Sequence, residues 1–165
     1  MMKIGLLSDT HGYLNPRIKK YFSNVDEIWH IGDIGNKEIL SELKQIAEVK
    51  AVYGNIDDAF IRNELPEYHI FSIKKIKVLL IHIGGYPGKY SPIARQLIFN
   101  HKPNLFISGH SHILKVMNDK TLNLLHINPG AAGIQGFHQV STVIKFEIND
   151  RVENLEVFEF PKRKS

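Results

Sequence analysis

Side chains of the kinds that bind divalent cations stand at or beside the ends of predicted strands, far apart in the chain. They are Asp9, His11, Asp33, Asn55, His82, His110 and His112. Imidazole, carboxylate and amide donors together suit manganese, zinc, iron or nickel better than calcium. Because the ends of several strands can share one edge of a sheet, these donors could converge into one metal centre. The chemistry that such a centre supports best is metal-assisted hydrolysis.

The strongest local motif is the Gly-His-Ser-His sequence at residues 109–112, which follows a predicted strand. Two imidazoles separated by one residue can face different neighbours across a shared site. Asp9 and His11 have the same spacing after the first predicted strand, where Gly12 lets the backbone turn closely. Taken alone, an Asp-X-His sequence is more often an ordinary surface turn.

Asp33 and Asn55 each come after a glycine at the end of a predicted strand, and His82 ends a strongly apolar one. Each has a simpler explanation by itself: a turn for Asp33 and Asn55, and a hydrogen-bonded core histidine for His82. The strand ends taken together are hard to obtain by chance, and they supply enough donors for two metal ions. A hydrolytic metalloenzyme is therefore the leading hypothesis.

The composition of the 165-residue chain is that of an ordinary globular protein, with 43% hydrophobic and 23% charged residues. A chain of this length buries about 70% of its unfolded surface when it folds as one domain. We expect a single domain over residues 1–160, followed by a basic tail at 161–165. The chain has no cysteine, which excludes disulfides and thiolate metal sites.

The net charge of +4 comes largely from Lys162, Arg163 and Lys164 in the tail, so the body is nearly neutral. The sequence has no stripe of basic residues interleaved with aromatics, the pattern typical of nucleic-acid-binding proteins. No apolar run approaches the ~20 residues that span a bilayer, and the N-terminus lacks the features of a secretory signal. We therefore expect no dedicated nucleic-acid surface, no membrane segment and a cytoplasmic location.

The first half of the chain alternates short β-branched runs with amphipathic segments, a pattern typical of βαβ units. It predicts strands at residues 3–8, 27–31 and 49–53, and helices at 16–22 and 37–47. We then expect a hairpin of strands 70–73 and 77–81, a helix at 92–100 and a strand at 105–108. The last of these helices has Ser91 as its expected N-cap and Pro92 at its first position.

From residue 114 onward the pattern is all strand, with strands at residues 114–117, 122–127, 141–148 and 152–158. We expect them to form a second sheet packed on the first, which gives an α/β (α+β) fold, a two-sheet β-sandwich flanked by helices. The glycine-rich loop 128–138 is the longest irregular segment of this half, and such loops are often functional. His138 closes this loop and is a candidate for contact with substrate.

The ordered set Asp-X-His, Gly-Asp, Gly-Asn, His and Gly-His-X-His resembles the signature of the calcineurin-like metallophosphoesterase superfamily, especially its small single-domain phosphodiesterase branch. The resemblance runs from residue 4 to about 133 and implies a four-layer β-sandwich wrapped by helices. It implies that one metal ion is held by Asp9, His11, Asp33 and His112. The other is held by Asp33, Asn55, His82 and His110, so that Asp33 bridges the two.

The activity that this resemblance implies is hydrolysis of small phosphodiesters by a hydroxide that bridges two divalent ions. Two such ions about 4 Å apart lower the pKa of water and neutralise phosphoryl charge. We expect manganese, with zinc, iron or nickel as alternatives, and we expect Asn55, His82 and His110 to be the catalytic neighbours of the substrate. A phosphomonoesterase, a protein-binding scaffold like the family's retromer subunit, and a purely structural metal site are the alternatives.

Two positions depart from the family pattern. Many members carry a histidine after the Gly-Asn pair that assists the leaving group, whereas this chain has Ile56. The aspartate that follows in the small branch is kept as Asp57, which joins the expected catalytic residues. Ile83 stands where a glycine usually follows His82, and this predicts a reshaped loop.

The histidines outside the signature are expected to be surface or packing residues: His30, His69, His101 and His126. Exposed strands of the last predicted hairpin could pair between chains, so a homo-oligomer is also expected.

Overall fold

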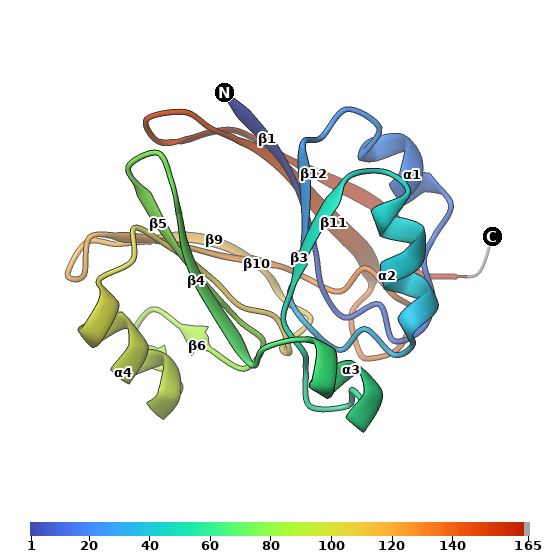
Figure 1. Ribbon diagram of the computed structural model, residues 1–165, viewed down its shortest axis with the longest axis horizontal. Helices are drawn as coiled ribbons and strands as arrows, with labels where there is room; N and C mark the ends of the chain where they lie inside the picture. The colour runs from blue at the N-terminus through green and yellow to red at the C-terminus, as the bar shows by residue number, and fades with distance from the viewer. Residues whose placement is uncertain (164–165) are drawn as a thin grey trace.

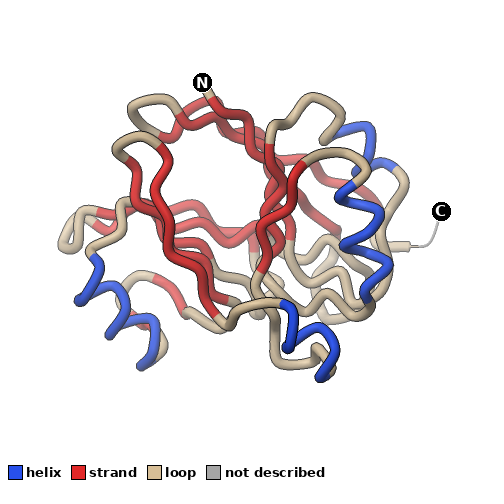
Figure 2. Tube along the Cα trace, viewed as in Figure 1, coloured by secondary structure: helices blue, strands red, loops and turns tan. Residues whose placement is uncertain are grey.

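The computed structural model describes residues 1–163, so Lys164 and Ser165 of the expected tail lie outside the described residues. The elements are, in chain order, β1 (Met2–Leu7), α1 (Arg17–Tyr21), β2 (Glu27–His30), α2 (Lys37–Lys44), β3 (Glu48–Ala51), α3 (Ala59–Glu64), β4 (Tyr68–Ile73), β5 (Ile76–Ile81), β6 (Gly85–Tyr86), β7 (Lys89–Tyr90), α4 (Pro92–His101), β8 (Leu105–Ile107), β9 (Leu114–Asp119), β10 (Leu124–Pro129), β11 (Val140–Ile148) and β12 (Val152–Pro161). Within these residues, two layers of strands face each other with the helices outside them (Figure 1, Figure 2).

The strands form two five-stranded sheets and a separate two-stranded hairpin, β6–β7. The first sheet has the order β12-β11-β1-β2-β3, and the second has the order β4-β5-β8-β10-β9. In the first sheet β1, β2 and β3 are parallel, and in the second β5, β8 and β10 are parallel. Each sheet therefore brings the carboxyl ends of its central strands to one edge, where ligands bind in many α/β folds.

The core has three parts because successive side chains of a strand point to opposite faces. Leu6 of β1 and Leu80 of β5 belong to the buried cluster between the two sheets. Leu7 belongs to the cluster that the first sheet shares with α1 and α2. Leu79 belongs to the cluster that the second sheet shares with α4. The order helix, sheet, sheet, helix confirms the expected four-layer sandwich.

The expected grouping of the last strands into one separate sheet is wrong. β9 and β10 complete the sheet that contains β4, β5 and β8, whereas β11 and β12 extend the first sheet beyond β1. β11 pairs antiparallel with β1, and Ile4 lies opposite Phe146 in that pairing. Both hairpins have an apolar face and turn residues, and that local pattern does not determine which sheet edge a hairpin joins.

Capping residues mark the starts of α4 and α3. Ser91 accepts a hydrogen bond from the amide of Ala94 and Pro92 is the first residue of α4, as expected, while Lys102 ends the helix in the left-handed conformation. Asp58 caps α3 in the same way, a short helix that the apolar pattern did not predict. None of the helices within residues 1–163 is long and apolar enough to cross a membrane.

Candidate metal centre

The loops that follow the parallel strands lie side by side and are joined by backbone hydrogen bonds. Within the first sheet, the amide of His11 donates to the carbonyl of Asp33 at 3.0 Å. Within the second sheet, the amide of Gly109 donates to the carbonyl of His82 at 2.9 Å. These hydrogen bonds hold the strand ends that carry the predicted donors next to one another. The donors meet at the end of the sandwich where the parallel strands of both sheets have their carboxyl ends.

Asp9, His11 and His112 form a first set of converging donors, called here the Asp9 group. One carboxylate oxygen of Asp9, Oδ1, lies 3.2 Å from Nε2 of His112 and 3.7 Å from Nε2 of His11. The other oxygen, Oδ2, accepts hydrogen bonds from the Ser8 hydroxyl at 2.6 Å and from the His110 amide at 3.1 Å. Oδ2 is thus anchored to the protein, while Oδ1 faces the two imidazoles.

Asp33, His82 and His110 form a second set, called here the His82 group. Nε2 of His82 lies 3.2 Å from Oδ2 of Asp33. The amide oxygen of Asn55 lies 3.1 Å from Nε2 of His82 and 3.0 Å from Nδ1 of His110. Asn55 therefore stands among these donors, and all seven residues singled out in the sequence lie at one place.

Asp33 lies between the two groups. Its Oδ2 is 3.2 Å from Nε2 of His82 and 3.6 Å from Nε2 of His11, which belongs to the other group. Its Oδ1 accepts a hydrogen bond from the amide of Ile56 at 3.0 Å. The position of Oδ2 suits a carboxylate that serves both groups.

Several donors have a left-handed backbone conformation that residues other than glycine rarely adopt. The φ angles are 56° at Asp9, 47° at His11, 53° at Asp33, 70° at His110 and 62° at His112. Such a residue costs about 1–2 kcal/mol relative to the right-handed conformation. Strain of this kind clusters at functional sites, because the surrounding structure must enforce it. The concentration of left-handed donors here is independent support for a functional centre.

Two of the neighbouring glycines are required by close approach. A Cβ on Gly54 would lie 2.1 Å from Oδ1 of Asp33, and a Cβ on Gly109 would lie 2.3 Å from the Ser8 hydroxyl. Both distances are shorter than any nonbonded contact that a real side chain makes. The glycines that drew attention in the sequence therefore make room for the carboxylates of Asp33 and Asp9.

The carboxylates and imidazoles shift one another's pKa values. Burial alone would raise the pKa of Asp9, but contacts with His11 and His112 outweigh it and hold the pKa well below its usual range. The pKa of His11 is raised, chiefly by Asp9. Without a cation, a proton on His11 supplies positive charge that Asp9 attracts. A divalent cation would replace that proton.

The His82 group shows the same balance. Burial works to raise the pKa of Asp33 and to lower that of His82, yet their mutual contact prevails in both cases. The pKa of Asp33 is therefore lowered and that of His82 is raised. In both groups the carboxylate therefore stabilises a positive charge beside it.

The donors fit a divalent transition-metal ion. Within residues 1–163, the buried side-chain polar atoms without a hydrogen-bond partner are Oδ1 of Asp9, Nε2 of His11 and Nδ1 of His138. The first two are donors of the Asp9 group, and such atoms are normally paired. Nδ1 of His82 lies 2.7 Å from the carbonyl of Ile31. A proton on Nδ1 leaves the Nε2 lone pair free for a metal ion.

Asp57, an expected catalytic residue, has both of its carboxylate oxygens bound to backbone amides. Its Oδ1 accepts hydrogen bonds from the amides of Ile34 at 2.9 Å and Gly35 at 3.0 Å, and its Oδ2 accepts one from Gly54 at 2.8 Å. The carboxylate is buried and joins the turn that carries Asp33 to the turn that carries Asn55. The structure thus gives Asp57 the contacts of a positioning residue.

His138 lies next to the Asp9 group, with its ring centroid 5.2 Å from that of His112. Its Nε2 is 2.9 Å from the carbonyl of Gly133, and burial lowers its pKa.

Position 56 offers no proton donor, because Ile56 is an exposed aliphatic side chain. Ile83 stands where the family pattern has a glycine, and the chain after it forms the β6–β7 hairpin.

The remaining histidines match the prediction of packing or surface roles. His30 is buried, its Nε2 lies 3.0 Å from the Thr10 hydroxyl, and burial lowers its pKa to about 3. His126 is buried and stacks on Phe106 with 5.1 Å between ring centroids. His69 is half-buried and His101 is exposed.

Two hollows border the His82 group, and apart from Asn55, His82 and His110 the sequence did not indicate the residues that line them. The hairpin pocket, of about 510 Å³, includes Tyr86, Lys89, His110 and Lys115 in its lining. The Arg62 pocket, of about 390 Å³, includes Tyr53, Asn55, Arg62, Glu67 and His82. Ile83 and Ser91 line both pockets. The Gly-Gly-Tyr-Pro-Gly sequence at residues 84–88 is a turn signal that could have indicated the hairpin.

Arg62 supports the loop of the candidate centre from the side of its pocket. Its Nη2 donates to the carbonyl of Asn55 at 2.9 Å and its Nε donates to that of Asp57 at 2.7 Å. The guanidinium also lies 4.9 Å from the ring centroid of Tyr53. These contacts fix the backbone from which the Asn55 amide projects.

Comparison with known proteins agrees with this geometry. Residues 2–151 match the model of the calcineurin-like phosphoesterase superfamily domain. A probable metallophosphoesterase of Methanocaldococcus jannaschii is 35% identical over 158 residues, which cover 92% of this chain and 79% of that protein. A phosphodiesterase of the same organism is 27% identical over 146 residues, which cover 78% of this chain and 83% of that protein.

Solved structures share the fold at lower sequence identity. A Vps29 single mutant from Entamoeba histolytica has a TM-score of 0.76 at 20% identity, covering 96% of this chain and 99% of that one. A novel archaeal phosphodiesterase also has a TM-score of 0.76, at 21% identity, covering 96% of this chain and 100% of that one. From the extent of the family match and the identity to the first relative, the chain belongs to the calcineurin-like phosphoesterase superfamily.

Proposed function

We propose that this protein hydrolyses small phosphodiesters with the help of two divalent metal ions. The observation that carries the proposal is the convergence of two donor groups, with Oδ2 of Asp33 within 3.6 Å of an imidazole nitrogen of each. The 27% identity to a protein named a phosphodiesterase supports the reaction class.

One ion would be held by Asp9, His11, Asp33 and His112, and the other by Asp33, Asn55, His82 and His110. When bound, a pair of divalent ions supplies an activated water molecule and neutralises the charge on the phosphoryl oxygens. Manganese is our first choice, with zinc, iron or nickel as alternatives, since all accept mixed nitrogen and oxygen donors.

The chain's own residues orient the reaction rather than carry it out covalently. Asn55 and His110 stand at the exposed side of the His82 group, so a phosphate that reaches this group meets their amide and imidazole first. The second carboxylate oxygen of Asp9 is fixed by Ser8 and the His110 amide, which keeps the first oxygen pointed inward. Arg62 and Asp57 hold the Asn55 loop in place.

A diester is favoured over a monoester by the two pockets. A phosphodiester has an organic group on each side of its phosphorus, whereas a monoester has one. The hairpin pocket and the Arg62 pocket border the same group and are separated by Ile83 and Ser91, which line both. Two pockets beside one phosphate position match a substrate with two organic arms.

The test is hydrolysis of bis-p-nitrophenyl phosphate by protein that has been stripped with a chelator and reloaded with manganese. We expect turnover that depends on the metal and exceeds that of p-nitrophenyl phosphate, a monoester, under the same conditions. Faster turnover of the monoester would favour a phosphomonoesterase. An absence of turnover with manganese, zinc, iron and nickel would reject the proposal.

The second candidate function is a protein-binding scaffold, which the likeness to Vps29 suggests at the level of fold alone. The complete donor set argues against it, because Asp9 Oδ1 and His11 Nε2 are buried without a hydrogen bond and a scaffold does not need such atoms. Metal content separates a scaffold without an ion from a metal site, and turnover by the metal-loaded protein separates a catalytic site from a structural one. A structural site would hold its ion without turnover, with no coordination position open to water.

A further inference from the structure

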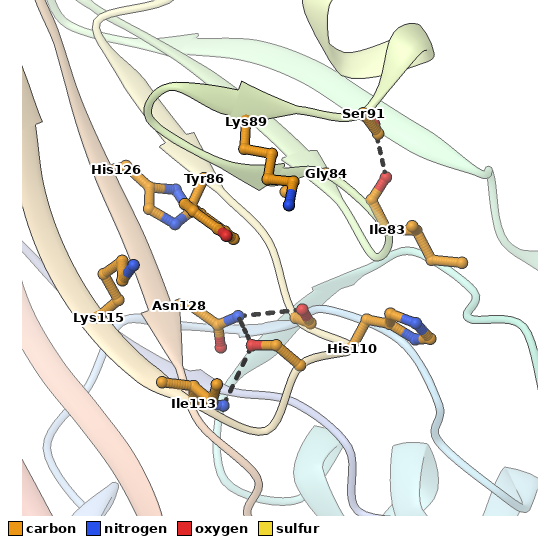
Figure 3. A pocket seen from close by; sticks show the side chains of 13 residues that line it. Ile83, Gly84, Tyr86, Lys89, Ser91, His110, Ile113, Lys115, His126 and Asn128 are labelled. Carbon is orange, nitrogen blue, oxygen red and sulfur yellow. Dashed lines mark hydrogen bonds between the residues drawn. The ribbon is translucent and has the colours of Figure 1, made fainter.

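The hairpin pocket opens beside His110 and has a volume of about 510 Å³, a size that is typical of sites for small organic molecules. Its walls come from the β6–β7 hairpin, which carries Tyr86 and Lys89, and from residues 109–115, which carry His110 and Lys115 (Figure 3). Because His110 belongs to the His82 group, the pocket is continuous with the candidate metal centre.

The hairpin wall is fixed to the second sheet by side-chain and backbone hydrogen bonds. The Ser91 amide donates to the Gly84 carbonyl at 2.9 Å, and the Ser108 hydroxyl donates to the Gly85 carbonyl at 3.1 Å. At the other end, the Tyr90 hydroxyl donates to a carboxylate oxygen of Asp119 at 2.6 Å. The pocket is therefore preformed on this side.

The opposite wall is fixed by Asn128, whose Nδ2 donates to the Gly109 carbonyl at 3.0 Å and contacts the Ser111 hydroxyl at 3.1 Å (Figure 3). The Ser111 hydroxyl in turn accepts a hydrogen bond from the Ile113 amide at 3.1 Å. The same segment carries His110, so the pocket wall and a candidate metal donor share one rigid support.

The charge of the pocket is positive and uncompensated. Its lining contains Lys89 and Lys115 but no carboxylate, and neither ammonium forms an ion pair with any residue from 1 to 163. Nζ of Lys115 lies 4.1 Å from the ring centroid of Tyr86, which holds this charge against the wall. Lys115 also helps burial to lower the pKa of His126 to about 4.

Apolar surface lies next to these cations. Ile83 is 42% exposed, Tyr86 is 40% exposed and Ile113 is 62% exposed, and all three line the pocket. An exposed apolar surface of this kind beside two unpaired ammonium groups matches a ligand that has a short organic chain and an anionic end.

We propose that the hairpin pocket binds one organic arm of the substrate, and that this arm carries a second anionic group, a phosphate or a carboxylate, which pairs with Lys115 and Lys89. The inference rests on the proposed function, because His110 links the pocket to the phosphodiester that reacts. The substrate class is then a phosphodiester with one charged arm and one uncharged arm.

The Arg62 pocket suits the uncharged arm. Its lining includes the carboxylate of Glu67, and its guanidinium already donates to the carbonyls of Asn55 and Asp57. A second anion would meet the like charge of Glu67 there, and the charge of Arg62 is already balanced in part by this carboxylate and turned toward two carbonyls. The two pockets therefore differ in charge, and this difference would orient the substrate with its anionic arm in the hairpin pocket and its uncharged arm in the Arg62 pocket.

The test compares p-nitrophenyl phosphodiesters whose second alcohol is butanol, γ-hydroxybutyrate or butanediol monophosphate. We expect kcat/KM for at least one anionic substrate to exceed that for the butyl ester by about fivefold or more. The better of the two anionic arms identifies the group as a carboxylate or a phosphate. Ratios at or below unity for both would overturn the proposal.

A variant with both Lys89→Met and Lys115→Met should bring that ratio close to unity. The matched control is Lys120→Met, which removes an exposed lysine of the β9–β10 turn that lines a different hollow, and it should keep the wild-type ratio. A double variant that keeps the full preference for the anionic arm would contradict the assignment of the two lysines.

A measurement without turnover separates this inference from the proposed function. Butyl phosphate added to the metal-free, isotope-labelled protein should shift the amide resonances of residues 84–90 and 111–115, and the double lysine variant should lose these shifts. No shift in these segments of the wild-type protein would overturn the pocket. Such shifts in a protein that hydrolyses no phosphodiester would leave the anion pocket standing and reject only the activity.

Discussion

The two donor groups differ in how complete they are without a cation. In the Asp9 group, Oδ1 of Asp9 and Nε2 of His11 are buried and lack hydrogen-bond partners. In the His82 group, the Asn55 amide oxygen lies within hydrogen-bond distance of both imidazoles, and His110 is exposed. The first group thus needs a cation to satisfy its donors, while the second can rearrange around an incoming phosphate. The difference suggests a tightly held ion beside a more accessible one.

The largest expected effect comes from removing the residue that the two groups share. Asp33→Ala should lower kcat for bis-p-nitrophenyl phosphate by about a thousandfold or more, because several kcal/mol of charge stabilisation are lost with the ions. Asp150→Ala, at an exposed turn, is the matched control and should behave like the wild type. Near-normal turnover in Asp33→Ala would refute the shared role.

Asp57→Ala tests whether the His82 group, whose Asn55 loop Asp57 holds through the Gly54 amide, depends on this support more strongly than the Asp9 group does. The substitution leaves the amides of Ile34, Gly35 and Gly54 without their acceptor, so it should lower the free energy of unfolding by about 4 kcal/mol. Denaturant unfolding measures this loss. Metal analysis of the folded variant should give about one ion per chain. Two tightly held ions would mean that the His82 group does not depend on Asp57, and none would mean that both groups do.

Removing one imidazole from each group should affect the metal-free protein unequally. His112→Ala takes away the partner 3.2 Å from Oδ1 of Asp9, a fully buried carboxylate, and should cost about 2 kcal/mol of stability. His110→Ala removes an exposed side chain and should cost less than about 0.5 kcal/mol. Equal losses in thermal unfolding of the two variants would erase the distinction between the groups.

The smallest effect concerns the left-handed backbone. His110 has a φ of 70°, so His110→Gly should be more stable than His110→Ala by about 1 kcal/mol in the metal-free protein. This order is opposite to the usual preference for alanine over glycine in a folded chain. The same comparison at Lys120, in the β9–β10 turn, serves as the control, because Lys120 is not among the residues with positive φ. A more stable alanine variant at position 110 would argue against backbone strain.

Much of the candidate site was predictable because its residues sit next to features that a sequence displays. Asp9, Asp33 and Asn55 follow apolar runs, and the last two come directly after glycines, so their strand-end positions can be inferred without coordinates. Ser91 followed by Pro92 is a local signal of a helix start, and the structure has that helix. Such predictions depend on interactions between near neighbours in the chain.

The rest depends on contacts between distant segments, which no local pattern encodes. The pairing of β11 with β1 joins residues more than a hundred positions apart, and it decided how the last strands divide between the sheets. Asp57 was expected to be catalytic, but its contacts with Ile34 and Gly35 make it a link between turns. A shared pocket of Lys89 and Lys115 cannot be inferred from the sequence, because it exists only where the β6–β7 hairpin lies against residues 109–115.

Each donor group draws side chains from both sheets. Asp9 and Asp33 follow strands of the first sheet, whereas His82, His110 and His112 follow strands of the second. A bound ion would therefore link the two halves of the sandwich at the ends of their parallel strands. It would add to the contacts that already join these loops, such as the hydrogen bond from the His110 amide to Asp9.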